Sequence, residues 1–174
     1  MNFTVRPVRA EELDDAFCVI EEGRRAISEL GIDQWQNGSP SRESIRLDIE
    51  EMRLYGAYDE EGLCAVCALC GGIEPYYNRI DGKWLTNGPY ITIHRMAAND
   101  RARHAGAAQA LLDEAERIAR DSGIPSLRAD THRGNRVMQR FMDKNGFVNC
   151  GITDYTPQIT GGDPIRIVYE KRME

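Results

Sequence analysis

Apolar residues alternate with polar ones in some stretches of the chain and recur every three or four positions in others. Alternation is typical of a strand with one buried face, and the longer period is typical of an amphipathic helix. These patterns predict strands at residues 3–8, 54–58, 63–73, 89–98, 126–131, 147–152 and 165–170. The helical period predicts helices at 11–30, along the stripe Ile45, Ile49 and Met52, from 108 to a stop at Gly123, and around 135–144.

Polar stretches rich in turn formers separate these elements. WQNGSPS (35–41) and GGDP (161–164) predict turns, and the aperiodic stretch 74–88 predicts a loop. The order of helices and strands predicts a mixed sheet with helices on both faces. The strands at 89–98 and 126–131 flank one helix, so a βαβ crossover should make them parallel neighbours.

The bulk composition is that of an ordinary globular domain. The 174 residues are 41% hydrophobic and 29% charged, which fits one domain over 1–174 with a real core. The net charge of −6 disfavours nucleic acid as a partner, because phosphate binding needs a basic surface. No run of about 18 apolar residues occurs, and MNFTVRPVRAEEL lacks the apolar centre of a signal peptide. We therefore expect a cytoplasmic protein without a membrane partner.

Three cysteines fall in the stretch LCAVCALCGGIEP. The spacing of Cys64, Cys67 and Cys70 is similar to a ferredoxin cluster motif, with Glu74 at the fourth position. The apolar neighbours instead predict a buried strand, in which residues three apart face opposite sides, so Cys64 and Cys67 would not meet on one metal ion. We expect no metal site and interpret the cysteines as small core residues, with a metal or electron-transfer protein as the alternative.

The stretch RARHAGAAQALL (101–112) crowds small residues where a helix is about to begin. The first turn of a helix has unpaired N–H groups and a partial positive charge, so an anion docks there if no side chain blocks it. Gly106 permits close approach and unusual backbone angles. Arg101, Arg103 and His104 supply positive charge around the rim. The stretch predicts a phosphate cradle, with an alanine-rich helix start packed under a sheet as the alternative.

RHAGAA (103–108) fits neither the Walker A pattern nor the glycine pattern of dinucleotide sites. It resembles the [RQ]-x-x-G-x-[GA] signature of the GNAT superfamily of N-acetyltransferases. IHRMAAN before it, NRVMQRFMDKNGF (135–147) after it and the opening FTVRPVRAEELD are similar to further elements of that family. The resemblance runs over nearly the whole chain, and the combination of DTH (130–132), MQRFMDKNGFVNCGI (138–152) and GDPIRIVYE (162–170) is similar to a bacterial branch of the family. It implies an α/β (α+β) fold with a mostly antiparallel, GNAT-like central sheet of six to seven strands.

The resemblance implies acetyl-CoA as cosubstrate, held mainly by main-chain groups. Met96, Ala97 and Ala98 match the strand end that pairs with the pantetheine arm. Arg103 matches the entrance of the pyrophosphate loop. The N–H groups implied to hold the pyrophosphate belong to His104, Ala105, Gly106, Ala107, Ala108 and Gln109. Asn135 matches an asparagine that commonly contacts the coenzyme, and a helix N-cap explains it equally well.

Transfer to an amine needs a base, because an alkylammonium with a pKa near ~10 must first lose a proton. His94 shares strand parity with Met96 and stands where relatives often carry a base, and a structural histidine is the alternative. The N–H group of Met96 is the expected donor to the developing oxyanion. His132 and Glu74 are further candidates for the base, each with a structural alternative.

The general acid is where this chain departs from the family. Many relatives place a tyrosine seven residues after the equivalent of Asn135, and this chain has Met142 there. Methionine cannot donate a proton, so Tyr155 is the candidate acid, with Cys150 or solvent as alternatives. A thiolate with a pKa near ~8.5 can leave without a dedicated acid. A non-catalytic acyl-CoA binder or sensor on the same fold is the alternative function that the missing tyrosine favours.

The acceptor is less clearly encoded than the coenzyme site. We expect direct attack in a ternary complex by the primary amine of a small molecule or peptide, and a homodimer stays open. Trp35 either lines the acceptor pocket or packs its own loop, and packing is the safer expectation. Tyr76, Tyr77 and Trp84 in the aperiodic loop are expected near the acceptor.

Overall fold

The computed structural model describes residues 2–156 and 162–173. The helices are α1 (Leu13–Glu29), α2 (Arg42–Glu50), α3 (Ala107–Asp121) and α4 (Arg136–Lys144), with short 3-10 turns at Ala10–Glu12 and Pro75–Asn78. The strands are β1 (Thr4–Pro7), β2 (Leu54–Asp59), β3 (Gly62–Gly71), β4 (Asp81–Gly82), β5 (Ile91–Ala98), β6 (Ser126–His132), β7 (Val148–Asp154) and β8 (Ile165–Arg172). Every predicted helix and strand is present, and the predicted turn at 161–164 lies partly outside the described residues.

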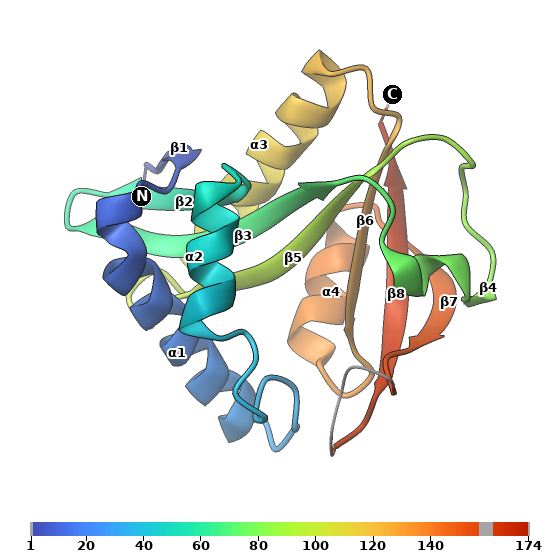
Figure 1. Cartoon of the computed structure of the whole chain (residues 1–174), viewed down its shortest axis with the longest axis horizontal. Helices are drawn as coiled ribbons and strands as arrows, with labels where there is room; N and C mark the ends of the chain where they lie inside the picture. Colours follow the sequence, from blue (N-terminus) through green and yellow to red (C-terminus); the bar gives the residue numbers. More distant parts are fainter. Residues whose placement is uncertain (1, 157–161, 174) are drawn as a thin grey trace.

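The strands form one eight-stranded sheet in the order β1-β2-β3-β5-β6-β8-β7-β4 (Figure 1). The pairs are antiparallel except for β5 and β6, which are parallel as the crossover predicted. The sheet exceeds the expected six to seven strands, because the predicted loop at 74–88 contains β4, which pairs with Gly151 and Ile152 of β7. A two-residue strand is too short to show a period in the sequence.

Helices cover both faces of the sheet, as predicted (Figure 1). On one face, α1 and α2 pack through residues such as Ile20 and Ile45. On the other face, Leu111 of α3 and Met142 of α4 belong to a larger apolar cluster. The predicted stripe of the second helix is wrong at its end, because α2 stops at Glu50 and Met52 follows it with a φ of 56° and 73% exposure.

A bulge in β5 shapes the middle of the sheet. Against β3, the segment from His94 to Ala97 contains one residue too many, and Arg95 within it has a φ of 55°. Such a bulge bends the strand and increases its twist. The ladder between β5 and β6 covers only Ile91 to Ile93 of β5, and beyond it the two strands diverge (Figure 1). We call this opening the β5–β6 fork, formed by residues 94–98 and 130–132.

The loop at 83–90 is clamped to the sheet by a buried ion pair. Arg128 of β6 lies 3.3 Å from Glu170 of β8, and its guanidinium carbon lies 4.0 Å from the ring centres of both Trp84 and Tyr90. Glu170 is fully buried and also accepts hydrogen bonds from the loop itself. A buried carboxylate needs such partners, so the loop and the sheet hold each other in place.

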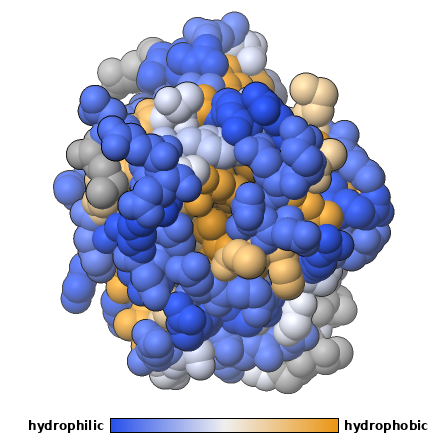
Figure 2. All heavy atoms as spheres, turned by 90° about the vertical axis from the view of Figure 1, so that its left-hand side faces the viewer, coloured by the Kyte–Doolittle hydropathy of each residue, from blue (hydrophilic) through white to orange (hydrophobic). Residues whose placement is uncertain are grey.

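Figure 2 shows one face of the molecule, which is hydrophilic over most of its area, with apolar atoms visible in smaller patches. Within the part of the chain that the structure describes, no helix is both long enough and apolar enough to cross a membrane.

Candidate active site

The N-terminus of α3 is open, as the stretch RHAGAA predicts. Gly106 is the N-cap residue, with a φ of 100°, and no described side chain caps the first turn. A Cβ at this position would meet, among the described atoms, Phe3 at 3.9 Å. The first helical hydrogen bond is donated by Ala110 to the Gly106 carbonyl, so the N–H groups of 107–109 point out of the helix end. Bare amides behind a left-handed glycine are suited to receive an anion.

The turn before α3, residues 99–106, which we call the α3 loop, is held by its own contacts. Asn99 accepts hydrogen bonds from main-chain N–H groups of the loop through both its side chain and its carbonyl. Ala102 and Ala107 are buried against the sheet in the apolar cluster that contains Leu111 and Met142, which we call the α3-side core. Small residues therefore serve two ends here, because they permit close packing under the sheet and leave the helix end accessible.

The three predicted rim residues have different surroundings. Arg101 donates to two carboxylates of the β2–β3 turn, at 2.9 and 3.0 Å, and so ties the α3 loop to the sheet. Arg103 pairs with Asp100 at 2.5 Å. His104 is exposed and has a φ of 68°. The exposed His104 and the half-buried Arg103 lie beside the open helix end, and their contact with a ligand stays a prediction.

Met96, Ala97 and Ala98 form the β5 side of the fork. In the described structure the β5–β6 ladder ends at Ile93, so the main-chain edge of these three residues does not pair with β6. An extended ligand can form main-chain hydrogen bonds with such an edge, as an additional strand would. The side chains leave this edge clear, because Met96 and Ala98 pack toward α3 and Ala97 packs toward α1.

The bulge makes one prediction from the sequence wrong. Simple alternation places His94 and Met96 on the same face of the strand. In the structure, Ile93 and Met96 pack into the same apolar cluster, because the extra residue at Arg95 shifts the alternation. His94 therefore faces away from the Met96 side chain, and a regular period of two cannot reveal a bulge.

A cavity of about 510 Å³ lies at the β5–β6 fork. Its walls come from the loop after α1, from β3, β5, β6 and α4, and from the residues around the start of β8. The residues predicted from sequence that line it are Trp35, Glu74, His94, Met96, Asn135, Met142 and Tyr155. Tyr77 and Trp84 are also expected near the acceptor, but they do not line this cavity. Their rings pack against each other, with centres 5.1 Å apart. The cavity thus joins segments far apart in sequence at the end of the predicted coenzyme strand.

His94 and Glu74 form a pair in the cavity wall. Nε2 of His94 lies 3.3 Å from Oε2 of Glu74, and each side chain is about one-fifth exposed, at 19% and 21%. The hydrogen bond from His94 lowers the pKa of Glu74, with Arg95 adding to the effect. An ionised Glu74 accepts from Nε2–H, which leaves Nδ1 of His94 as the free acceptor. The lowered pKa makes Glu74 a weak base.

Tyr155 lies in the cavity wall, and its proton is already engaged. Its hydroxyl donates to Oδ2 of Asp130 at 3.0 Å, and Tyr77 donates to the same oxygen at 2.7 Å. The Tyr155 ring stacks on Tyr76, with centres 4.3 Å apart. Burial and the Asp130 carboxylate raise the pKa of Tyr155 well above its ordinary range. The hydroxyl therefore stays protonated, and its role as general acid stays a prediction.

The two other positions considered for the acid have different environments. Met142, which replaces the family tyrosine, is 3% exposed, and it packs in the α3-side core while contacting the cavity. Cys150 is buried next to Val168 in a separate apolar cluster, and burial raises the pKa of its thiol. Neither side chain offers a readily released proton to the cavity.

Asn135 is the N-cap of α4. Its side-chain oxygen accepts from the N–H group of Met138 at 3.1 Å. Its side-chain nitrogen donates to Gln34, in the loop after α1, at 3.0 Å. The capping interpretation is therefore confirmed, and contact with a coenzyme stays a prediction.

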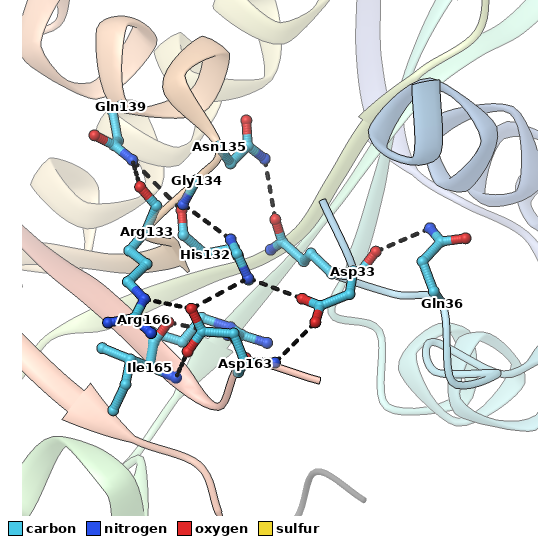
Figure 3. Close-up of polar contacts among 11 residues, drawn as sticks. Asp33, Gln36, His132, Arg133, Gly134, Asn135, Gln139, Asp163, Ile165 and Arg166 are labelled. Atoms are coloured by element: carbon cyan, nitrogen blue, oxygen red, sulfur yellow. Dashed lines mark hydrogen bonds and ion pairs between the residues drawn. The ribbon is translucent and has the colours of Figure 1, made fainter. Parts of the chain in front are cut away.

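The sequence did not reveal the polar cluster around His132, which Figure 3 shows. Nδ1 of His132 accepts from the N–H group of Gly134 at 2.9 Å, so Nε2 carries the proton. Nε2 lies 2.9 Å from Asp33 and 3.7 Å from Asp163, and Arg133 also pairs with Asp163. The cluster ties the loop after α1 to the start of β8. The two carboxylates are too far apart in sequence for any local pattern to pair them.

A second network that the sequence did not reveal lies under the bulge. Asp48 of α2 is fully buried and accepts from Arg95 at 2.6 and 2.8 Å and from Arg53 at 2.6 Å. The left-handed backbone of Arg95 is unusual for a residue other than glycine or asparagine. The bidentate ion pair with a buried carboxylate fixes that residue, and with it the bulge, in place.

The cysteine stretch forms β3, as predicted. Cys64 and Cys67 are fully buried, and burial raises the pKa values of both thiols, which disfavours the thiolates that bind metals. Across residues 2–156 and 162–173, no group of three or more His, Cys, Asp or Glu residues is arranged to hold a metal ion.

Comparisons with known proteins agree with this geometry. The family model of the acetyltransferase (GNAT) family matches residues 17–147. An acetyltransferase of the GNAT family from Streptococcus agalactiae is 32% identical, with a TM-score of 0.87 over 99% of this chain and 96% of that one. A search of curated proteins gave no match.

More distant structures share the fold. A PaiA N-acetyltransferase from Thermoplasma acidophilum, solved in complex with coenzyme A, is 23% identical, with a TM-score of 0.70 over 99% of both chains. An acetyltransferase of the GNAT family from Listeria monocytogenes is 17% identical, with a TM-score of 0.73 over 98% of this chain and 94% of that one. The family model covers most of the chain, and strands β2 to β6, the β5 bulge and the open α3 helix lie within the matched region. The chain belongs to the GNAT family of acetyltransferases.

Proposed function

We propose that the protein is an acetyl-CoA-dependent N-acetyltransferase that moves the acetyl group to a primary amine by direct attack in a ternary complex. The observation that carries the proposal is the uncapped end of α3 at Gly106, where a side chain is missing and bare amides face open space. Membership of the GNAT family supports acetyl transfer, and a structural neighbour binds coenzyme A. The amine as acceptor is the finer part of the proposal.

The residues at the fork fit the parts of the cosubstrate. The main-chain edge of Met96, Ala97 and Ala98 suits the amide groups of the pantetheine arm. The N–H groups of His104 and of 106–109, with Arg103 beside them, suit the pyrophosphate, whereas the N–H group of Ala105 already donates to the Ala102 carbonyl at 3.0 Å. Asn135 lines the same cavity at the start of α4, and its side-chain oxygen already caps that helix. When bound, acetyl-CoA supplies an acyl group already activated as a thioester.

His94 is proposed as the base. The ionised Glu74 holds the Nε2 proton, so Nδ1 takes the proton from the incoming ammonium or from a water next to it. Glu74 also stabilises the charge that His94 gains, as a carboxylate does in other base–carboxylate pairs. The N–H group of Met96 is proposed to donate to the carbonyl oxygen as negative charge develops on it.

Tyr155 remains the proposed acid, although its proton is held by Asp130. The raised pKa makes Tyr155 a reluctant donor. A coenzyme thiol ionises near ~8.5, so at neutral pH its thiolate is a moderate leaving group that solvent can protonate. Loss of the Tyr155 hydroxyl should therefore have a small effect on turnover.

Coenzyme binding and amine-dependent turnover test the proposal together. Titration calorimetry with acetyl-CoA measures binding, and chromatographic detection of free coenzyme A across an amine panel measures transfer. Chromatography is preferable to a thiol reagent because Cys18 is exposed and would react. Binding with amine-dependent release supports the proposal. Binding without release from any amine would favour the acyl-CoA sensor, which the buried Met142 in place of a tyrosine makes a specific alternative.

A further inference from the structure

Arg166, near the start of β8, is an arginine buried without a carboxylate partner. It is 8% exposed and lines the cavity. Its Nη1 donates to the main-chain carbonyls of Asp163 at 2.7 Å and Ile165 at 3.0 Å. Among the described residues, no carboxylate oxygen lies within 4.0 Å of the guanidinium, and its Nε and Nη2 atoms make no hydrogen bond.

The other arginines of the cavity are neutralised by carboxylates. Arg95 makes two bonds to the buried Asp48. Arg53 makes a third and also pairs with Glu51 at 2.5 Å, so two carboxylates balance the two arginines. These two guanidinium groups stabilise the bulge, and carboxylates already compensate their positive charges. Arg166 differs because two neutral carbonyls orient it without cancelling its charge.

The acidic groups near Arg166 have other partners of their own. Asp163 pairs with Arg133 and lies near His132, and both groups are part of the cluster in Figure 3. The Asp130 carboxylate accepts hydrogen bonds from the hydroxyls of Tyr77 and Tyr155, and no cationic side chain among the described residues lies within 4.0 Å of it. Burial lowers the pKa of Arg166, while Asp130 acts in the opposite direction from a distance. A buried charge of this kind is stabilised when an anion arrives.

We propose that Arg166 binds the carboxylate of the acceptor, so that the protein acetylates amines that also carry a carboxylate, amino acids being the simplest. This inference rests on the proposed function and names its substrate class. A guanidinium with two nitrogens free presents a planar fork that matches a carboxylate. Nearby Asp130 and Asp163 oppose a dianion such as a phosphate more strongly than a monoanion, which favours the carboxylate.

The cavity has room for such an acceptor between two chemically different walls. Its volume of about 510 Å³ lies within the range for small-molecule pockets. The proposed base His94 stands on β5, and Arg166 stands on β8, across the intervening β6. A carboxylate anchored at β8 therefore directs an amine toward the β5 wall, where the thioester is proposed to lie.

The first test uses the unmodified protein. Turnover of a panel of amino acids is compared with turnover of their carboxamides, which keep the amine and the side chain and lose the negative charge. We expect kcat/KM to favour the acids by about tenfold or more, since a hydrogen bond to a charged group contributes about that much. Equal use of acids and amides would overturn the inference.

The second test changes the arginine. Arg166→Gln should reduce the preference for the acid over the amide to within about threefold, mainly through KM, and Arg166→Lys should retain part of it, because charge remains without the fork. Arg133→Gln is the matched control, because Arg133 pairs with the same Asp163 while its side chain is 60% exposed. An unchanged preference in Arg166→Gln would overturn the inference. If Arg166→Gln does not fold, the acid-over-amide preferences of Arg166→Lys and of the unmodified protein decide whether Arg166 binds the carboxylate.

A third measurement separates this inference from the proposed function. Should no amine be acetylated, calorimetry with N-acetylated amino acids and N-acetylated amino-acid amides still tests the Arg166 site. Tighter binding of the acids by about tenfold would support the carboxylate site although transfer had failed. Equal binding would overturn the site, whether or not the enzyme acetylates other amines.

Discussion

The two parts of the proposed site on either side of the β5 bulge are built in different ways. The α3 loop and the edge of β5 offer main-chain groups, because Gly106 leaves the helix end bare and the side chains of 96–98 are turned into the core. The cavity offers charged side chains, most of them paired with an oppositely charged partner, as His94 is with Glu74 and Arg95 is with Asp48, while Arg166 has no carboxylate partner among the described residues. The first part suits a ligand common to a whole family, and the second suits one particular acceptor.

The difference also bears on tolerance to substitution. Main-chain donors survive most changes of side chain, so the α3 loop depends on very few positions, and Gly106 is the clearest of them. The cavity depends on pairs, in which loss of one partner leaves the other buried without compensation. We therefore expect single substitutions in the cavity to change specificity and pH dependence more readily than coenzyme affinity.

The largest effect is expected at Gly106, which tests the main-chain half of the comparison. A valine there would fill the space in front of the amides and strain a backbone with a φ of 100°. We expect Gly106→Val to weaken acetyl-CoA binding by about 1,000-fold or more, because several hydrogen bonds to charged phosphates are lost together. Titration calorimetry measures this affinity.

The control for Gly106→Val is a valine at the other end of α3. Gly123 has a φ of 66° and, like Gly106, has room around it, since no described atom lies within 4 Å of an added Cβ. Gly123→Val therefore imposes a similar backbone strain and should leave acetyl-CoA affinity unchanged. Equal affinities in all three proteins would show that the α3 loop does not bind the coenzyme.

The next effect concerns the cavity, where His94→Ala removes the proposed base. We expect turnover at pH 7 to fall by about 10- to 100-fold, as loss of a general base does. The loss should shrink at pH 9, where a larger share of an amine with a pKa near ~10 is already neutral. Rates at saturating acetyl-CoA across this range measure it, with unchanged acetyl-CoA affinity as the control. The same loss at both pH values would exclude proton transfer as the role of His94.

What the sequence reveals follows the same division. The open, uncapped start of α3 is a local property, because Gly106 and its alanine neighbours are adjacent in the chain. The parallel pairing of β5 with β6 follows from one crossover helix, and the buried cysteine strand follows from its apolar neighbours. These features need little knowledge of distant residues.

The features that the sequence does not reveal all depend on distant partners. The bulge in β5 depends on Asp48 in α2, so a regular alternation misplaces Met96 relative to His94. Asp33 and Asp163 meet at His132 because the fold brings two loops together. The short strand β4 exists because β7 offers it an edge. None of these pairings leaves a period or a motif in the sequence.

Asn135 stands between the two regions, and a smaller effect there indicates which it serves. Asn135→Ala removes the N-cap of α4, and we expect the free energy of unfolding to fall by about 1 kcal/mol. Asn135→Asp keeps the capping oxygen and should retain most of that stability. Urea unfolding and acetyl-CoA titration are run on both variants. A loss of affinity in both, together with a stable Asn135→Asp protein, would show a coenzyme contact made by the side-chain nitrogen.

The smallest expected effect is a pH dependence of the free energy of unfolding that comes from the His94–Glu74 pair in the cavity wall. The hydrogen bond from His94 holds the pKa of Glu74 below its ordinary value of 4.5, so folded protein keeps this carboxylate ionised where the unfolded chain protonates it. Stability from the pair is then present above that ordinary value and is lost as the pH falls through the folded pKa. We expect Glu74→Gln to be less stable by about 0.5–1 kcal/mol at pH ~6, and the difference to shrink progressively as the pH falls below 4.5. Urea unfolding at several pH values measures this, and a difference that does not change with pH would mean that Glu74 acts through packing rather than through its charge.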